Sequence, residues 1–221
     1  MLVKPTTEKT PVKKREAKRA WSVDDILKKV YKTLSFSKPF FEAFKNPQST
    51  GLWFIWGESG SGKSSFILQL ITELAKSSRV VVNDLEEADD MTVQDAFKRF
   101  GLQCLKKKLI WCSETMEEFA MRMESPKAPK IMVINSFQYM GWSFAKMLAF
   151  KRRHKDKLII IVSGCDGKQP DGRAAKSTMK DASLKIWVEG YKAFSKGRYI
   201  GENGGVYVIW KEGAELYHGV D

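Results

Sequence analysis

The chain has 221 residues, a hydrophobic share of 43% and a formal net charge of +12 at pH 7. This length suits one α/β domain with a short appendage and excludes two substantial domains. No apolar run reaches the roughly 18 residues of a membrane span, and the amino terminus lacks the apolar core of a signal peptide. We therefore expect a soluble, cytoplasmic protein without membrane contact.

The positive charge is uneven along the chain. Residues 1–20 carry seven basic and two acidic side chains and almost no large apolar residue. Such a composition predicts a disordered basic tail, followed by one folded domain over 21–221. The tail is interpreted as a DNA or RNA contact, or alternatively as a solubilising or tethering segment. The three scattered cysteines show no metal-type pairing and are expected to be reduced thiols.

The predicted elements alternate between helices and strands. Apolar spacing from Val23 to Tyr31 predicts a first helix with Ser22 as its N-cap, and a helix should follow the apolar strand at 52–56. Further strands are predicted at 79–83, 109–112, 131–135, 158–162, 184–189 and 205–210. Further helices are predicted from a capping-box-like segment at 92–95, and over 115–123 and 142–153. A final hairpin is expected around 212–213.

This order indicates an α/β fold with a mostly parallel central sheet, helices on both faces and a C-terminal antiparallel hairpin at the edge. Residues 158–162 are almost purely β-branched, which predicts a central strand. Ligands of such sheets bind at the carboxyl ends of the strands. Functional residues are therefore expected directly after the strong strands.

A phosphate-binding loop follows the strand at 52–56. Gly57, Gly62, Lys63 and Ser64 have the spacing G-x-x-x-x-G-K-[ST]. Backbone N–H groups of the loop and the next helix N-terminus would bind a polyphosphate, Lys63 would reach its β- and γ-phosphates, and Ser64 would ligate Mg²⁺. The predicted ATP-binding residues are Gly57, Glu58, Ser59, Gly60, Ser61, Gly62, Lys63, Ser64 and Ser65.

Polar residues follow the next strong strands. They are Asp84, Glu86 and Glu87 after the second strand, Asn135, Ser136 and Gln138 after 131–134, and Ser163 after 158–162. Together with the phosphate loop and a late Lys196-Gly-Arg198 segment, this order resembles the RecA-like ATPases, and within them the RadA and DnaB-type branch. The resemblance covers roughly residues 50–218.

The resemblance implies catalytic roles. Glu86 would polarise the water that attacks the γ-phosphate, with Glu87 as the neighbouring candidate; the alternative is that both merely solvate an acidic loop. Ser163 and Gln138 would sense the γ-phosphate, or simply end their strands. Basic residues late in the chain would enter the neighbouring subunit's site, or form a solvated turn. These residues are Lys196 and Arg198.

The chain departs from the family at the fourth motif. A Walker B strand should end in an aspartate that holds Mg²⁺ through water, and this strand ends in Asn135. Its amide supplies no negative charge, although its oxygen still accepts a hydrogen bond from a metal-bound water. Asp84, at the end of a neighbouring strand, is the candidate substitute. Either hydrolysis is slow or the metal shell is rebuilt from Ser64, Asn135 and Asp84.

The segment 164–181 is polar and glycine-rich and is expected to form a long mobile loop at the nucleotide edge. RecA-like proteins place a DNA-contacting loop here, and the phosphate contacts would come from Lys168, Arg173, Lys176 and Lys180. A subunit contact or a flexible loop is the alternative. The basic run 151–157 should lie at the opposite edge, as a helix cap and solvated face or, second, as an auxiliary nucleic-acid patch.

The sequence thus predicts an ATP- and Mg²⁺-dependent RecA-like ATPase that acts on DNA in recombination, repair or replication as a homo-oligomer. The main alternative is a catalytically weak nucleotide-binding switch or adaptor that orders a nucleoprotein assembly, because of Asn135. A small-molecule kinase shares the phosphate loop, but the chain has no paired-arginine lid.

Overall fold

The structure is a computed structural model that describes residues 20–198, 200 and 204–220. Nearly all of the expected basic tail lies outside these residues. The chain divides into two units, Met1–Tyr31 and Lys32–Asp221. In the first, α1 (Val23–Leu27) begins at the predicted N-cap, where Ser22 and Asp25 form a reciprocal capping box. The helix start is confirmed, but the helix is shorter than its apolar pattern.

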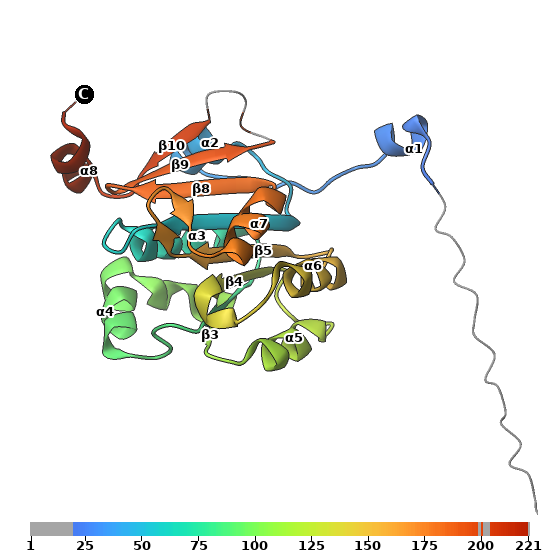
Figure 1. Cartoon of the computed structure of the whole chain (residues 1–221), viewed down its shortest axis with the longest axis horizontal. Coiled ribbons are helices and arrows are strands. Elements are labelled where there is room, and N and C mark those ends of the chain that lie inside the picture. Colours follow the sequence, from blue (N-terminus) through green and yellow to red (C-terminus); the bar gives the residue numbers. More distant parts are fainter. Residues whose placement is uncertain (1–19, 199, 201–203, 221) are drawn as a thin grey trace, which may run out of the picture. The chain divides into compact units, whose positions relative to one another are not determined.

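The second unit is built on an eight-stranded sheet with the order β10-β9-β8-β1-β5-β4-β2-β3 (Figure 1). Its strands are β1 (Gly51–Gly57), β2 (Val80–Asp84), β3 (Leu109–Cys112), β4 (Ile131–Asn135), β5 (Leu158–Ser163), β8 (Leu184–Glu189), β9 (Lys192–Gly197) and β10 (Gly205–Val208). A separate small pair is formed by β6 (Cys165–Asp166) and β7 (Gln169–Pro170). β9 and β10 are antiparallel to their neighbours, whereas the other six strands are parallel. The predicted sheet is confirmed, including its antiparallel edge.

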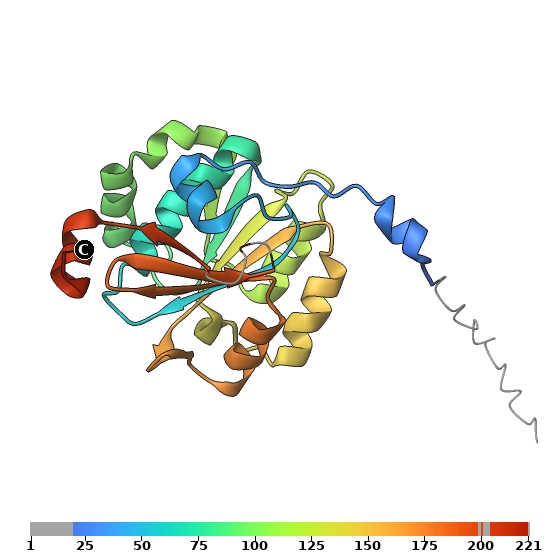
Figure 2. The same ribbon diagram turned by 90° about the horizontal axis from the view of Figure 1, so that it is seen from above.

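Helices cover both faces of this sheet, as the view from above shows (Figure 2). One face carries α2 (Lys38–Phe44), α3 (Lys63–Ser77), α4 (Met91–Phe100) and the 3-10 helix η1 (Leu102–Lys108). The other carries α5 (Met116–Glu124), the 3-10 helix η2 (Phe137–Met140), α6 (Phe144–Arg153) and α7 (Arg173–Asp181). α8 (Lys211–His218) follows the last strand.

β1 shows why both faces are covered. Its side chains alternate between the two cores, with Trp53 on the α3 side and Phe54 on the α6 side, and both are fully buried. A strand buried on both faces belongs in the sheet interior. β1 accordingly lies between β5 and β8, and the register brings Gly57 beside Val188.

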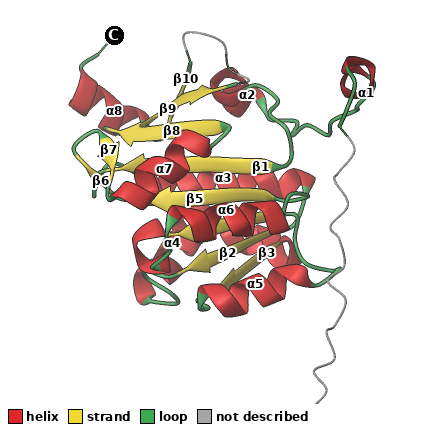
Figure 3. Ribbon diagram, turned by 45° about the vertical axis from the view of Figure 1, so that its right-hand side comes forward, coloured by secondary structure: helices red, strands yellow, loops and turns green. Residues whose placement is uncertain are grey.

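The parallel strands point the same way, with their arrowheads on the left of Figure 3. Their carboxyl ends therefore form one edge of the sheet, where β1 leads into the phosphate loop. Their amino ends form the opposite edge. No helix in the described part of the chain is long and apolar enough to cross a membrane.

Three sequence expectations fail locally. Half of the expected mobile loop is α7, which buries only Ala175 and Thr178, so its small residues gave no apolar signal. The hairpin at 212–213 is instead part of α8. Gly213 there is required by a close approach, because a Cβ would lie 2.3 Å from the Trp210 ring.

The fourth helix is also capped differently from the prediction. α4 begins at Met91 with Asp90 as N-cap, and the Thr92 hydroxyl donates to Glu87 instead of accepting a backbone N–H as an N-cap residue does. α2 and β9 were not predicted. Burial alternates along β9, but the strand carries lysine and serine, which give no apolar alternation in the sequence. The buried Ser195 hydroxyl donates to the carbonyl of Ala43.

Candidate nucleotide site

The phosphate loop is fixed between β1 and the start of α3. Gly57 ends the strand where a Cβ would lie 2.2 Å from the Val188 carbonyl oxygen, so no side chain fits there. Gly62 is the N-cap of α3 in the left-handed region, with φ 98°. This conformation favours glycine, and the first N–H groups of α3 have no side-chain cap. The close contact at Gly57 and the positive φ at Gly62 both require glycine, whereas the role of these residues in phosphate binding stays a prediction.

Lys63 is the first residue of α3 and spans the loop. Its Nζ donates to the Glu58 carbonyl oxygen at 2.6 Å, so the ammonium lies over the concave side of the turn. Burial lowers the pKa of the Lys63 ammonium, while the nearby Cys165 and Glu86 act in the opposite direction. A partly desolvated cation inside a glycine-rich turn provides the charge that a polyphosphate needs.

The turn between β8 and β9 braces the loop, which the sequence did not indicate. The Tyr191 N–H donates to the Ser61 carbonyl at 3.0 Å. The Tyr191 ring packs against Gly62 so closely that a Cβ on Gly62 would lie 2.9 Å from it. Tyr191 in turn packs edge-on against Trp210, with ring centroids 5.0 Å apart. The antiparallel edge of the sheet thus contributes directly to the shape of the phosphate loop.

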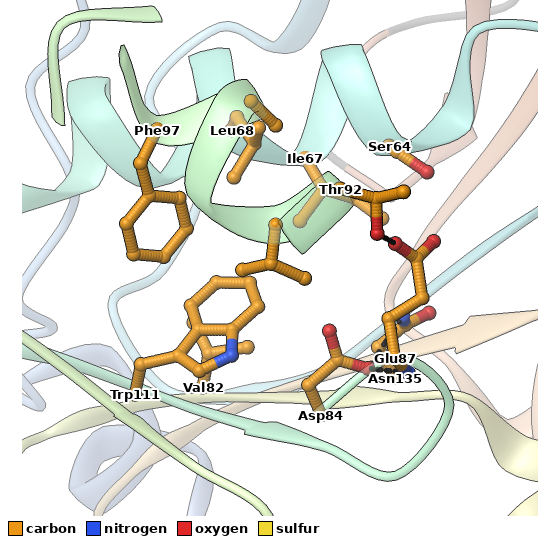
Figure 4. Close-up of a pocket in the computed structure, with 12 residues that line it drawn as sticks. Ser64, Ile67, Leu68, Val82, Asp84, Glu87, Thr92, Phe97, Trp111 and Asn135 are labelled. Carbon is orange, nitrogen blue, oxygen red and sulfur yellow. Dashed lines mark hydrogen bonds between the residues drawn. The ribbon is translucent and has the colours of Figure 1, made fainter. Parts of the chain in front are cut away.

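The expected metal ligands lie together beside the loop. Ser64, Asp84, Glu87 and Asn135 line one cavity of about 50 Å³. Figure 4 shows these side chains at one end, with Phe97 and the other apolar groups at the opposite end. The carboxyl end of β2 lies next to that of β4, and Asp84 is the register partner of Asn135. Asn135 Nδ2 donates to Asp84 Oδ1 at 3.0 Å.

This donor set fits Mg²⁺ bound together with phosphates. Among the described residues no group of three or more His, Cys, Asp or Glu side chains could hold a metal by itself. The cavity instead offers the Ser64 hydroxyl, the Asp84 carboxylate and the Asn135 amide. Magnesium in phosphate-transfer sites takes one or two carboxylates and completes its shell with phosphates and water. The carboxylate missing from β4 is available from β2.

Asp84 is held in one position and is 3% exposed. Its Oδ1 also accepts from the backbone N–H groups of Glu86 at 3.2 Å and Glu87 at 3.4 Å. Burial raises the pKa of the Asp84 carboxyl, and these hydrogen bonds partly oppose that rise. The carboxylate is thus preorganised, and among the described residues no cationic side chain pairs with it. A divalent cation would remove that cost.

The two candidate catalytic glutamates lie differently. Glu87 lines the cavity and its Oε2 accepts the Thr92 hydroxyl at 2.6 Å. Glu86 is exposed and contributes to the electrostatic field at Lys63. The structure brings both to the nucleotide edge. Glu86 is free to turn toward the loop, whereas Glu87 is tied to α4.

The expected γ-phosphate sensors contact each other. Gln138 Nε2 donates to Ser163 Oγ at 2.8 Å, and the Gly164 N–H donates to Gln138 Oε1 at 3.1 Å. These residues join the ends of β4 and β5 in the row of strand ends that contains the phosphate loop.

The candidate DNA residues do not form one loop. Lys168 is exposed in the turn between β6 and β7, and its carbonyl accepts Trp56 Nε1 at 3.2 Å. Arg173, Lys176 and Lys180 lie on α7, which runs back toward the amino edge of the sheet. The expectation of a single mobile loop was wrong for these three, because α7 packs on the sheet through its small residues.

Lys196 and Arg198 are far from the phosphate loop of their own chain. β9 is antiparallel to β8, so Lys196 pairs with Lys185 near the amino end of β8, while Gly57 pairs at its other end. Within one chain the structure does not bring these cations to the nucleotide site. A role for them remains a prediction about a neighbouring copy.

Comparisons with known proteins show the fold. The chain is similar to the flagellar accessory protein FlaH from Methanocaldococcus jannaschii, with 14% identity and a TM-score of 0.59 over 80% of this chain and 93% of that one. It is also similar to a KaiC-like protein from Pyrococcus horikoshii OT3, with 15% identity and a TM-score of 0.56 over 79% of this chain and 99% of that one. No protein-family model matches the sequence, and no curated protein is significantly similar to it.

The sheet order, the loop and these similarities define the class. The chain has the RecA-like P-loop NTPase fold, with its phosphate loop at the carboxyl edge of a mostly parallel sheet.

Proposed function

We propose that this chain binds ATP with Mg²⁺ at the phosphate loop and hydrolyses it. The observation that carries the proposal is the cavity beside Lys63, which gathers the Ser64 hydroxyl with Asp84 and Asn135 from two neighbouring strands. Membership of the RadA and DnaB-type branch is part of this proposal, supported by the order of motifs along the chain.

Each residue has a distinct task in the proposal. Lys63 and the loop N–H groups hold the phosphates, and Mg²⁺ supplies neutralisation of their negative charge. Asp84 provides the carboxylate of the metal shell, and the Asn135 amide keeps Oδ1 of Asp84 oriented by donating a hydrogen bond to it. Glu86 accepts a proton from the attacking water, because its side chain is free and lies in the field of Lys63.

The test measures phosphate release from MgATP. Lys63→Ala should abolish release, since it removes the only loop cation, whereas Lys76→Ala, at the other end of the same helix and exposed, should leave it unchanged. Glu86→Gln should reduce turnover by about 10²-fold or more while ATP binding persists. A larger loss from Glu87→Gln than from Glu86→Gln would assign the base to Glu87 instead.

We further propose that the protein acts on DNA as an accessory ATPase in recombination, repair or replication. Support comes from the contact between Trp56, at the end of the strand that enters the phosphate loop, and the backbone of Lys168. DNA should stimulate phosphate release, and the double substitution Lys168→Ala/Arg173→Ala should remove the stimulation. Trp56→Phe, which keeps an aromatic ring but removes the indole N–H that donates to Lys168, should weaken stimulation without changing the basal rate. Absence of any stimulation would contradict the DNA-dependent part.

A shared site between copies is proposed from Lys196 and Arg198. They lie at the sheet end opposite the phosphate loop, so they act only on a neighbour's nucleotide. Mixing Arg198→Ala with Lys63→Ala protein should restore some activity, because one mixed interface then has an intact loop and an intact arginine. A mixture as inactive as its components would argue against the shared site.

A nucleotide-binding switch is the second candidate, and Asn135 together with the buried Asp84 favours it. If Asp84 stays protonated, the metal shell lacks its negative charge and turnover is slow. Tight MgATP binding and ATP-dependent oligomers without phosphate release would support the switch.

A further inference from the structure

Cations gather at the amino edge of the sheet, opposite the phosphate loop. The first residues of β2, β3, β4 and β5 stand in one row, since Val80 pairs with both Leu109 and Ile131, and Ile131 with Leu158. The segments that enter these four strands therefore lie side by side, on the right of Figure 3. Seven exposed cations in these segments form what we call the amino-end basic face: Arg79, Lys106, Lys107, Lys108, Lys127, Arg152 and Lys155.

Contacts within the fold join these segments into one surface. The Arg79 guanidinium donates to the Lys127 carbonyl, which links the entries to β2 and β4. Lys130 Nζ binds Asp156 at 2.7 Å, which links the entries to β4 and β5. A groove of about 590 Å³ at the end of α3 is lined by the three lysines that enter β3.

The basic face carries positive charge that no acidic side chain of the described residues neutralises through an ion pair. Acidic side chains at this edge pair with other cations, as Glu124 does with Arg153 and Asp156 with Lys130. None of the seven cations of the basic face forms an ion pair among the described residues. Stabilisation of a helix C-terminus explains Arg152 at the end of α6, but not the lysines that lie outside α-helices.

We propose that the amino-end basic face binds the phosphate backbone of double-stranded DNA independently of nucleotide and sequence. Neighbouring strands are about 4.8 Å apart, so four of them span about 14 Å. A duplex presents one charge per about 1.7 Å, which is about eight charges over that length. Seven unpaired cations match this density.

The composition of the face favours a duplex over single-stranded nucleic acid and over a bilayer surface. The described residues include exposed aromatic side chains, among them Tyr139 and Trp210, but none lies in the segments that enter β2 to β5. Single-strand binding uses aromatic platforms for base stacking, and binding to a bilayer surface uses exposed apolar side chains. A purely cationic surface is suited to the backbone of a duplex.

The test is fluorescence anisotropy with the full chain and a 20-base-pair duplex of arbitrary sequence, without nucleotide, between about 50 and 200 mM salt. Two variants remove two cations each from different parts of the face: Lys107→Ala/Lys108→Ala, and Lys127→Ala/Lys155→Ala. The control Lys146→Ala/Lys211→Ala removes the same charge from exposed positions on α6 and α8. Each face variant should make the slope of log K against log salt less steep by about 2, and the control should not.

Several results would overturn the proposal. The first is a salt slope that is unchanged in both face variants, or one that changes equally in the control. The second is tighter binding of a single strand than of the duplex. The third is that the face variants lose binding to vesicles with anionic lipids as much as they lose binding to the duplex. A loss confined to the Lys168→Ala/Arg173→Ala variant would assign duplex binding to the other edge. The outcome is separable from ATP hydrolysis, because Lys63→Ala should keep duplex binding while losing phosphate release.

Discussion

Replacing Asp84 by asparagine should change stability in opposite directions with and without MgATP. Oδ1 of an asparagine can still accept the hydrogen bonds from Asn135 and the backbone, while the buried negative charge disappears. Because burial raises the pKa of Asp84 in the folded state, its contribution to stability is full below the unfolded pKa and is lost as pH rises through the folded pKa. Without ligand, Asp84→Asn should therefore have a higher Tm than the wild type at pH 7, and the two should converge at acidic pH.

With MgATP the sign reverses. Losing one carboxylate from a metal shell or its support lowers metal affinity by about 10- to 100-fold. That factor corresponds to about 1.4–2.7 kcal/mol. In a chain of this size 1 kcal/mol shifts Tm by about 2–4 °C, so the variant should lose about 3–11 °C of the stabilisation that MgATP gives the wild type.

Thermal melts with and without MgATP, between pH 5 and 8, measure both effects. Asp89→Asn is the matched control, because Asp89 is an exposed acid on the same loop. A variant that melts lower than the wild type without ligand would refute the assignment of Asp84 as a buried carboxylate without a cationic partner. An undiminished MgATP shift would refute its place in the metal shell.

Three further outcomes test the fold around the site. Gly57→Ala should prevent nucleotide binding and lower Tm, because its methyl group would lie 2.2 Å from a backbone oxygen of β8; melts and ATP titration measure this. Phe119→Ala, at a fully buried position, should cost about 3–5 kcal/mol in urea unfolding, whereas the exposed Met121→Ala on the same helix should stay within about 0.5 kcal/mol. Burial raises the pKa of Cys112 to about 11, so at pH 8 a thiol reagent should label the exposed Cys104 and spare Cys112.

The parallel strands were predictable from the sequence because they are buried on both faces. A continuous apolar run rich in β-branched residues, such as 158–162, favours a strand that is buried on both faces, and β5 lies in the sheet interior. The phosphate loop was predictable because its glycines satisfy local backbone requirements. Both signals are carried by short stretches of chain.

Elements that depend on distant contacts were not predictable. β9 is defined by pairing with β8 and β10, and α7 by packing small residues against the sheet. In the site, Tyr191 braces the phosphate loop through a backbone N–H, which leaves no trace in residue type. Thr92 looked like a helix cap and instead holds Glu87, because hydroxyl groups near a helix start have several acceptors in reach.

The relation between Asp84 and Asn135 explains why one of the two residues is an amide. β2 and β4 are adjacent and in register, so their last side chains lie 3.0 Å apart between Nδ2 and Oδ1. Two carboxylates at this separation would repel each other, and one of them would take up a proton. With Asp84 already at the end of β2, an aspartate at position 135 would add little negative charge to the cavity. Asn135 instead donates a hydrogen bond that fixes the one carboxylate, so its presence at the end of β4 is consistent with a charge that is supplied from the neighbouring strand.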